Sequence, residues 1–422
     1  MPPVCPYKAA MRVALLRLMV WLCFVVPCVS ALAEDAIGEK QLARIERAIA
    51  AGTAYLVEQQ EADGTWRSKT YGLLKDGTSL TPLAAWALAT EDAGRAACNR
   101  SVLWMSNWFI REDRHTRLVG ELQYPIYAAG LCLPIWKRSL VEEAPAQVVA
   151  WTDRIRALQL NEENGWSPDD ARYGGWGYSC KPPQKPEPGA PLSPLDEPNL
   201  SATVFALEGL LAGDREGRSI RAARQAAVVF VSRCQNLRQP ESAQKLQSSS
   251  GDTKFNDGGF HFMLDDPVRN KPGAAGIDGR GETRFVSYGS ATADGLRALL
   301  LCGIERTEPR VIAARRWLLA HFEDGAHPGS YPSDRSSLKP SLDYYYAASV
   351  ARALQAAPVP DDEPLGRGEW ARRLSRLLIS RQRDDGSWSN AAVDVREDDT
   401  LVATPLALRS LQICRDELRI SP

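Results

Sequence analysis

Two similar stretches at opposite ends of the chain limit its fold more than any other feature. Asp63-Gly64-Thr65-Trp66 is followed about fifteen residues later by Thr81-Pro82-Leu83-Ala84, and Asp385-Gly386-Ser387-Trp388 about sixteen residues later by Thr404-Pro405-Leu406-Ala407. An amphipathic segment that ends near a glutamine precedes each Asp-Gly turn. Such self-similarity marks a repeat architecture. The unit is a helical hairpin: an amphipathic helix, an aromatic turn and a second helix rich in Ala and Leu.

Weaker copies of this unit fill the middle of the chain. Their first helices are predicted near Trp104 and over 146–160, 220–234 and 309–322, and their second helices over 124–133, 200–211, 290–301 and 341–356. With the two end copies, the chain contains six hairpins. One hairpin cannot bury its apolar face alone, so neighbouring hairpins must stack.

The two kinds of helix predict two concentric layers. Amphipathic helices show charge to water on the outside, and Ala-rich helices approach one another closely on the inside. We therefore predict an all-α (α/α)6 toroid over residues 34–422. An open solenoid is the alternative, but its end repeats should be atypical caps, whereas here the first and last repeats match best. The polar stretch over about 239–283 exceeds the ~12–15 residues usual for structureless connections, so we predict a loop insertion over one mouth of the ring.

Residues 1–33 have the pattern of a secretory signal peptide. Three basic residues, Lys8, Arg12 and Arg17, precede the apolar run 18–29, and Ala31-Leu32-Ala33 forms a small-residue exit. The run is shorter than the ~20 apolar residues of a membrane span, although an uncleaved anchor is the alternative. The leader predicts export to the periplasm or the extracellular space, with no transmembrane segment after its removal.

Composition excludes several classes of partner and cofactor. The formal net charge of −1 argues against a nucleic-acid partner, which requires a basic surplus. No cysteines are paired at C-x-x-C spacing and the four histidines lack metal-ligand spacing, so we predict no metal and no cofactor. Six cysteines lie outside the leader, and the sequence does not determine whether any of them pair.

The segments Gln60–Trp66 and Gln382–Trp388 have the pattern Q-x2-DG-x-W, which resembles the QW motif of squalene–hopene cyclases and of prenyltransferase and squalene-oxidase repeat proteins. The resemblance covers essentially the whole mature chain and implies the toroid. In that family the glutamine caps a neighbouring helix and stacks on the tryptophan. The resemblance therefore implies a structural role for these four residues.

The resemblance also directs attention to three candidate catalytic acids. Class II cyclases of this family protonate substrate through a D-x-D-D-T motif, whose counterpart here is Asp196-Glu197-Pro198-Asn199-Leu200, with proline in place of the acid. Asp196 and Glu197 are predicted to cap the following helix. A second near-match runs over 396–400 and centres on Asp398, for which we predict capping and an ion pair with Arg396. Asp343 is the third candidate.

Zinc-dependent prenyltransferases of the same fold use Asp, Cys and His ligands. Ser287, Gly289 and Tyr346 occupy the corresponding positions here, so the resemblance implies no zinc site. Neither enzyme signature is intact, which favours a protein without catalytic activity.

Aromatic residues gather where the inner helices are predicted to begin, and they predict a ligand pocket. Candidate ligand-binding residues are Phe205, Tyr288, Tyr344, Tyr345 and Tyr346, with Tyr124 and Tyr127 beside them. Three consecutive tyrosines on a helix point in three directions, so at least one should face the cavity. Asp343 would add a polar group.

Two hypotheses follow from the sequence. The first is an exported binding or scaffold toroid whose partner is a hydrophobic or isoprenoid-like small molecule or another exported protein. The alternative is an enzyme, either a divergent terpene cyclase-like isomerase or lyase or a carbohydrate-active α/α barrel. For a carbohydrate-active site, two carboxylates ~5–9.5 Å apart should face each other across the cavity. The acids to test are Asp257, Asp265, Asp266, Asp343 and Asp398.

Overall fold

The computed structural model describes residues 38–109, 124–138, 144–213, 218–237, 255–278, 281–360, 363, 365–366 and 368–420. The predicted leader, and residues 239–254 of the predicted insertion, lie outside these ranges.

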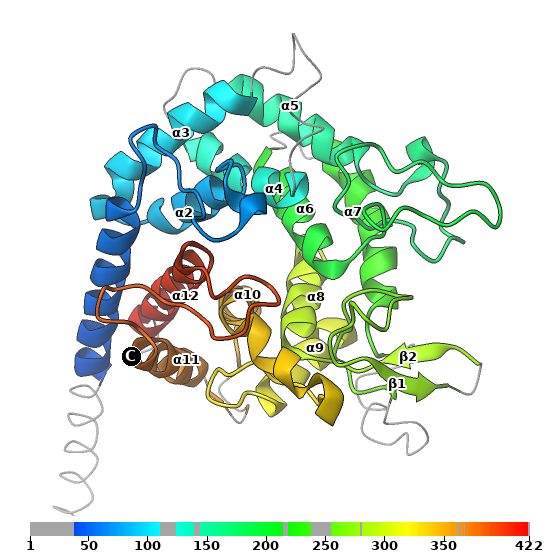
Figure 1. Cartoon of the computed structure of the whole chain (residues 1–422). Helices are drawn as coiled ribbons and strands as arrows, with labels where there is room; N and C mark the ends of the chain where they lie inside the picture. Colours follow the sequence, from blue (N-terminus) through cyan, green and yellow to red (C-terminus); the bar gives the residue numbers. More distant parts are fainter. Residues whose placement is uncertain are drawn as a thin grey trace, which may run out of the picture.

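Twelve α-helices make up most of the described chain (Figure 1). They are the helix over 38–58, α2 (Leu80–Leu88), α3 (Arg95–Phe109), α4 (Pro125–Arg138), α5 (Ala144–Ala157), α6 (Leu200–Gly213), α7 (Arg218–Arg233), α8 (Gly289–Leu301), α9 (Pro309–Ala320), α10 (Asp343–Ala356), α11 (Glu369–Ser380) and α12 (Thr400–Ile420). Short 3-10 turns lie between them at η1 (Gly72–Leu74), η2 (Asp92–Gly94), η5 (Glu162–Asn164) and η8 (Ser333–Leu342).

The even-numbered helices form a closed inner ring. Each of α2, α4, α6, α8, α10 and α12 packs on the next, and α12 returns to pack on α2. The odd-numbered helices lie outside them (Figure 1). The first outer helix, over 38–58, meets the last hairpin: Gln41 donates to Ser375 at 3.1 Å and Arg419 pairs with Glu46 at 2.6 Å. The predicted (α/α)6 toroid is confirmed.

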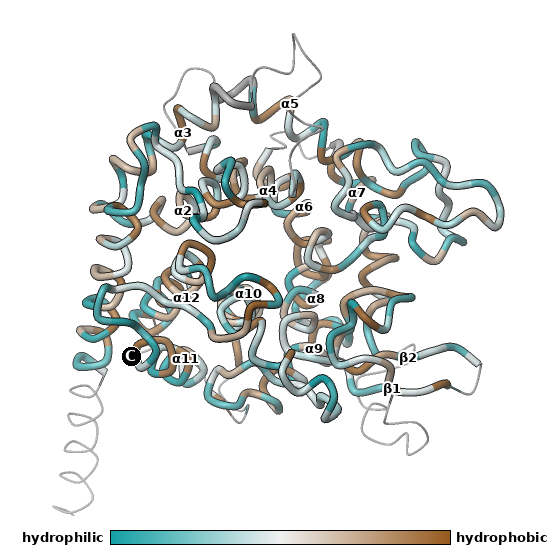
Figure 2. Tube along the Cα trace, viewed as in Figure 1, coloured by the Kyte–Doolittle hydropathy of each residue, from teal (hydrophilic) through white to brown (hydrophobic). Residues whose placement is uncertain are grey.

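Residue size and polarity explain which helix lies inside. In α6 every residue from Leu200 to Leu207 is buried, and small residues allow close packing: a Cβ added to Gly130 of α4 would lie 2.5 Å from the Phe205 carbonyl oxygen. The outer helix α11 instead buries one stripe, Trp370, Leu374 and Leu378, and turns its arginines to solvent. Figure 2 shows hydrophobic residues concentrated on the inner helices and hydrophilic residues in the loops.

A repeated hydrogen-bond arrangement, which we call the latch, joins successive outer helices. In four hairpins a glutamine at the end of the outer helix donates its side-chain amide to a glycine carbonyl four residues or more ahead and to a carbonyl of the next outer helix, all at 2.9–3.0 Å. The bonds are Gln60 to Gly64 and Ala97, Gln159 to Gly174 and Ala223, Gln235 to Gly258 and Arg310, and Gln382 to Gly386 and Ala48. The last latch returns to the first helix, which closes the ring.

Each latch also fixes the inner helix. The backbone N–H of the turn aromatic donates to an inner-helix threonine at 3.0–3.2 Å. The pairs are Trp66–Thr81, Trp176–Thr203, Phe260–Thr292 and Trp388–Thr404. Glycine is required in the turn, because Gly174 has a φ of +92° and an added Cβ would lie 1.9 Å from the Ala226 carbonyl oxygen.

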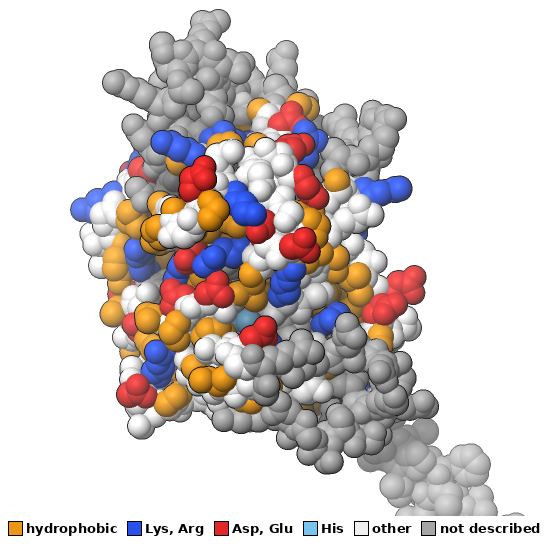
Figure 3. Space-filling model, turned by 90° about the vertical axis from the view of Figure 1, so that its right-hand side faces the viewer, with side chains coloured by type: hydrophobic (Ala, Val, Ile, Leu, Met, Phe, Trp, Pro, Cys, Tyr) orange, Lys and Arg blue, Asp and Glu red, His pale blue; other side chains and the backbone are white. Residues whose placement is uncertain are grey.

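The described part of the predicted insertion differs from an irregular loop. It contains an antiparallel β-hairpin of β1 (Ala274–Ile277) and β2 (Thr283–Phe285). The Asp278 N–H donates to the Glu282 carbonyl at 3.0 Å, next to the last strand pair, Ile277 and Thr283. The polar composition of this stretch did not indicate strands. On the surface around it, Figure 3 shows acidic and basic side chains interspersed.

None of the helices in the described ranges has both the length and the hydrophobicity needed to cross a membrane. The six cysteines outside the predicted leader are all free thiols.

Candidate functional site

A pocket of about 510 Å³ opens at the end of the ring where the inner helices begin. Residues from all six inner helices line it, together with residues of the segments that precede these helices. The lining residues are Leu74, Ser79, Leu80, Leu83, Tyr124, Tyr127, Leu131, Tyr178, Ser201, Phe205, Phe262, Val268, Arg269, Lys271, Tyr288, Ser290, Ala291, Asp294, Leu342, Tyr345, Asp394, Val395, Arg396, Val402 and Leu406.

The helix register arranges the interior of the ring in three tiers, one turn apart. The first tier is Ser79, Tyr127, Ser201, Ser290, Tyr345 and Val402. The second tier, four residues further along each helix, is Leu83, Leu131, Phe205, Asp294, Ser349 and Leu406. The third tier, three residues further again, is Trp86, Pro134, Glu208, Arg297, Arg352 and Arg409. Except for Ser349, the residues of the first two tiers line the pocket.

This arrangement gives the ring an electrostatic axis. Every inner helix follows an outer one, so all six run in the same direction and their N-termini meet at the pocket. Helix dipoles place partial positive charge at the N-termini and favour cations near the C-termini. Three arginines occupy the third tier, towards the C-termini, and the pocket end is favourable for an anion.

Aromatic and aliphatic side chains form most of the pocket wall. The rings of Tyr127 and Tyr178 stack with centroids 5.9 Å apart, and Phe205 lies 4.8 Å from Tyr127. Leu83, Leu131 and Leu406 complete the second tier around them. Such a wall binds an apolar body.

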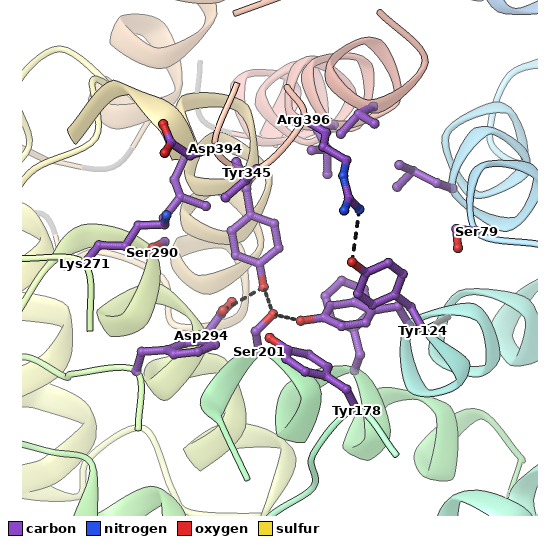
Figure 4. A pocket seen from close by; sticks show the side chains of 18 of the residues that line it. Ser79, Tyr124, Tyr178, Ser201, Lys271, Ser290, Asp294, Tyr345, Asp394 and Arg396 are labelled. Atoms are coloured by element: carbon purple, nitrogen blue, oxygen red, sulfur yellow. Dashed lines mark hydrogen bonds between the residues drawn. The ribbon is translucent and has the colours of Figure 1, made fainter. Parts of the chain in front are cut away.

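A chain of hydrogen bonds crosses the pocket from α4 to α8 (Figure 4). The Tyr127 hydroxyl lies 2.5 Å from the Ser201 hydroxyl, which lies 2.7 Å from the Tyr345 hydroxyl. Tyr345 in turn donates to Asp294 at 2.7 Å. We call these four residues the hydroxyl chain.

A buried ion network lies behind Asp294. Its carboxylate accepts from Ser349 and, at 3.0 Å, from Arg297, which pairs with Glu208 at 2.6 Å. Arg352 pairs with the same Glu208 at 2.5 Å. Burial raises the pKa of Asp294, and Arg297 opposes that shift. For Glu208 burial acts in the same sense, but the two guanidinium groups hold its pKa below the ordinary value. Two carboxylates and two guanidinium groups balance in charge.

Two cations at the rim form no salt bridge among the described residues, although the carboxylates of Asp394 and Glu397 act on Lys271 from a longer distance. Arg396 donates to the Tyr124 hydroxyl at 3.0 Å and lies over the Tyr71 ring at 5.6 Å. Its backbone is left-handed, with a φ of +64°, a conformation that only a few per cent of non-glycine residues adopt. Lys271, whose pKa is lowered by burial, also lines the pocket without an ion pair. Arg269, by contrast, pairs with Glu197 and Asp266.

The predicted aromatic residues divide between the pocket and the core. Phe205, Tyr288 and Tyr345 line the pocket, as do Tyr124 and Tyr127. The neighbours of Tyr345 do not, because successive residues on a helix point about 100° apart. Tyr344 is buried with its hydroxyl donating to the Ser389 carbonyl at 3.3 Å, and Tyr346 is fully buried with its ring 5.3 Å from His327.

None of the three predicted catalytic acids lines the pocket. Asp343 pairs with Arg381 at 2.7 Å, outside it. Asp398 accepts a hydrogen bond at 2.7 Å from Tyr71 rather than pairing with Arg396, because the left-handed backbone of Arg396 turns its side chain to Tyr124.

The predicted cap of α6 is also wrong. Asn199, and not Asp196, caps this helix: its side-chain oxygen accepts the Ala202 N–H at 2.9 Å. The helix begins only at Leu200, after Pro198, so Asp196 lies too far upstream. Glu197 instead pairs with Arg269 and Arg172.

The remaining acids proposed for carbohydrate chemistry lie in loops, where each carboxylate already has a hydrogen-bond or ion-pair partner. Asp257 accepts from Ser287 at 2.8 Å and from the Trp317 indole at 3.0 Å. Asp265 pairs with Arg172 and Asp266 with Arg269, both at 2.8 Å. The carboxylates that do line the pocket are Asp294 and the exposed Asp394.

Histidine and cysteine do not gather into a metal centre within the described ranges, where no three potential ligands come together. His327 uses both ring nitrogens locally: one accepts the Ser290 N–H at 3.1 Å and the other donates to the Lys339 carbonyl at 2.8 Å. Burial lowers its pKa to about 4.

Sequence reasoning missed Asp294, Ser201, Lys271 and Arg396. A signal for Asp294 was present: the residue two positions after the latch threonine is Leu83, Phe205 or Leu406 in three hairpins and an acid in the fourth. Lys271 and Arg396 lie in loops outside the repeat, and no pattern marks them.

A scan against protein-family models and a search of curated proteins gave no match. Among solved structures, a UGL variant with the oligosaccharide dGlcA-Glc-Rha-Glc matches with a TM-score of 0.50 at 17% identity, covering 87% of this chain and 95% of that chain. A glycosidase variant matches with a TM-score of 0.50 at 13% identity, covering 91% and 99%. The type II terpene cyclase MstE from Scytonema gives 0.49 at 13% identity, covering 89% and 99%. At these identities a likeness concerns the fold, and the chain is an α/α toroid.

Proposed function

We propose that the mouth of the ring binds a small molecule with an apolar, isoprenoid-like body and an anionic group. The observation that carries this proposal is that Arg396 and Lys271, two cations that form no salt bridge in the described chain, line the same aromatic and aliphatic pocket.

The physical chemistry of the pocket supports both halves of the ligand. Its volume of about 510 Å³ lies within the ~300–1,000 Å³ typical of small-molecule sites. Each Å² of apolar surface removed from water contributes about 25 cal/mol. A guanidinium group matches carboxylate and phosphate geometry, and the six helix N-termini add partial positive charge of the same sign.

Two finer assignments belong to the proposal. We propose membership of the QW-motif repeat family, supported by the four latches, two of which contain the Gln60–Trp66 and Gln382–Trp388 segments. We also propose export, supported by the leader pattern of residues 1–33. N-terminal sequencing of the expressed protein tests export, and a mature N-terminus at Glu34 is the expected result.

The binding proposal is tested with probes that share a chain and differ in the head group. Isothermal titration calorimetry with dodecyl phosphate, dodecanoic acid and dodecan-1-ol should show the two anions binding about tenfold or more tightly than the alcohol. Arg396→Gln and Lys271→Gln should each remove most of this preference. Arg376→Gln, on the exposed face of α11, is the matched control and should keep it. Equal affinity for all three probes would contradict the anionic group, and no binding would contradict the pocket.

A second candidate is an isomerase or lyase activity, favoured by one observation. Asp294 is a buried carboxylate that lines the pocket and is hydrogen-bonded to pocket hydroxyls, which suits a proton acceptor. Incubation with squalene, oxidosqualene and unsaturated oligosaccharides, followed by mass spectrometry, tests it. A product that disappears in Asp294→Asn would support catalysis, and the absence of any product would support binding alone.

A further inference from the structure

The pocket has two polar poles, the rim cations Arg396 and Lys271 and the hydroxyl chain that crosses the pocket between them (Figure 4). We infer that the hydroxyl chain is a subsite for a hydrogen-bond donor, so that the ligand is an apolar hydroxy acid, with its anion at the rim and its hydroxyl on the chain. This inference rests on the proposed function and names the class of ligand.

The direction of the hydrogen bonds follows from Asp294. Its carboxylate accepts from Arg297 at 3.0 Å and from Ser349, contacts that favour the ionised form, and an ionised carboxylate only accepts. The Tyr345 hydroxyl must therefore donate its single hydrogen to Asp294.

This direction passes along the rest of the chain. Because the Tyr345 hydrogen is used, the bond between Tyr345 and Ser201 requires Ser201 to donate. The Ser201 hydrogen is then used in turn, so Tyr127 donates to Ser201.

The pocket therefore contains a row of hydroxyl oxygens whose hydrogens are all used in bonds within the chain. Lone pairs remain on the hydroxyl oxygens of Tyr127, Ser201 and Tyr345, and a donor such as a hydroxyl satisfies them. An ether or carbonyl oxygen of the ligand at this place would face a hydroxyl oxygen without a hydrogen between them, which is unfavourable. A purely apolar end would leave the lone pairs without a partner.

The test compares three probes with the same anion and different far ends: dodecanoic acid, 12-hydroxydodecanoic acid and 12-methoxydodecanoic acid. Calorimetry should show the hydroxy acid binding about two- to tenfold more tightly than dodecanoic acid, the range for one net hydrogen bond. The methoxy acid should gain nothing. A series of hydroxy acids from eight to sixteen carbons should show an optimum that reports the span between the poles.

Two variants remove the hydrogen bond between Tyr345 and Asp294, which sets the direction of the other bonds in the chain. Tyr345→Phe removes the donor to Asp294 and leaves the other hydroxyls free to turn, so the preference for the hydroxyl should fall to less than twofold. Asp294→Asn gives a second route to the same loss. Tyr344→Phe is the matched control, because Tyr344 precedes Tyr345 on α10 but its hydroxyl donates to the Ser389 carbonyl outside the pocket. Circular dichroism melting curves confirm that each variant folds.

The outcomes separate the two proposals. Hydroxy acid and plain acid binding equally, both more tightly than dodecan-1-ol, would overturn this inference and leave the proposed function standing. A hydroxyl preference that persists in Tyr345→Phe and Asp294→Asn would also overturn it. No binding of any acid would overturn the proposed function itself.

Discussion

The latches and the pocket are built from the same hairpin and use the repeat in opposite ways. Each latch repeats one chemistry: a glutamine, a glycine, an aromatic residue and a threonine, with bond lengths that agree within 0.2 Å between hairpins. The pocket tiers occupy equivalent positions too, but each hairpin supplies a different side chain. The comparison shows that the residues which are the same in the repeats hold the ring together, whereas the residues which differ between repeats form the pocket.

Deleting a latch aromatic should have the largest effect on stability and none on ligand selectivity. Trp388 is fully buried, and its indole donates to the Leu378 carbonyl at 2.8 Å. Trp388→Ala should lower the free energy of unfolding by ~3–5 kcal/mol, as for other buried aromatics. Chemical denaturation measures this change. The exposed Val393 is the control, since Val393→Ala should shift stability by less than about 0.5 kcal/mol. A loss below about 1 kcal/mol for Trp388→Ala would show that the latches do not hold the ring together.

One buried carboxylate, Glu397, should dominate the pH dependence of the free energy of unfolding. Glu397 is buried and caps α10 by accepting the N–H groups of Tyr344 at 3.0 Å and Tyr345 at 2.7 Å. Burial raises its pKa from 4.5 to about 7. Between these values the folded protein holds a proton that the unfolded chain has released, so this contribution is complete below pH 4.5 and is lost as the pH rises through 7.

The loss is on the order of 3 kcal/mol, at about 1.4 kcal/mol for each pH unit of difference in pKa. Glu397→Gln cannot titrate, so its unfolding free energy should fall less than that of the unchanged protein between pH 5 and pH 8. Urea denaturation at the two pH values gives the comparison. Parallel pH curves for the two proteins would exclude this role of Glu397.

Equivalent latch positions should respond equally. Gln159→Ala and Gln382→Ala each remove two hydrogen bonds to backbone carbonyls and should cost about 1–3 kcal/mol. The two losses should agree within about 0.5 kcal/mol, the scatter expected of independent sites. Gln41→Ala removes a single bond to Ser375 and serves as control. Unequal losses of unfolding free energy would contradict the view that the latches are equivalent.

The smallest effect on stability should come with a large effect on binding. Arg396→Gly relieves a left-handed backbone that costs an L-residue roughly 1–2 kcal/mol, and should raise stability by about 0.5–1 kcal/mol after the gain in chain entropy of glycine. The preference for dodecyl phosphate over dodecan-1-ol should disappear. Asp324→Gly, at the other non-glycine position of positive φ in the described chain, should raise the melting temperature and leave binding unchanged. A fall in the melting temperature of Arg396→Gly would contradict the claim that the left-handed backbone at this position destabilises the folded protein.

The hairpins were predictable because periodicity is local. An amphipathic stripe such as Trp370, Leu374 and Leu378 announces an outer helix from its own sequence. Most of the pocket aromatics were also predictable, since they follow from helix starts. The acids were not. Asp196, Asp343 and Asp398 were chosen by resemblance to a motif. Asp343 pairs with Arg381 and Asp398 accepts from Tyr71, partners that the sequence does not place beside them, and Asp196 lies too far upstream to cap α6.

By itself, the sequence determined the number of hairpins, their two layers and the closure of the ring, because each follows from patterns within about 65 residues of chain and from the match between its ends. Only the tertiary structure decided the register of the six inner helices. That register stacks Ser201, Tyr345 and Asp294 from three hairpins into one hydrogen-bonded chain. It also brings Lys271 and Arg396, from two loops, to one rim. The physical reason is that a repeat fixes contacts between neighbouring hairpins, whereas a pocket on the ring axis collects side chains from all of them at once.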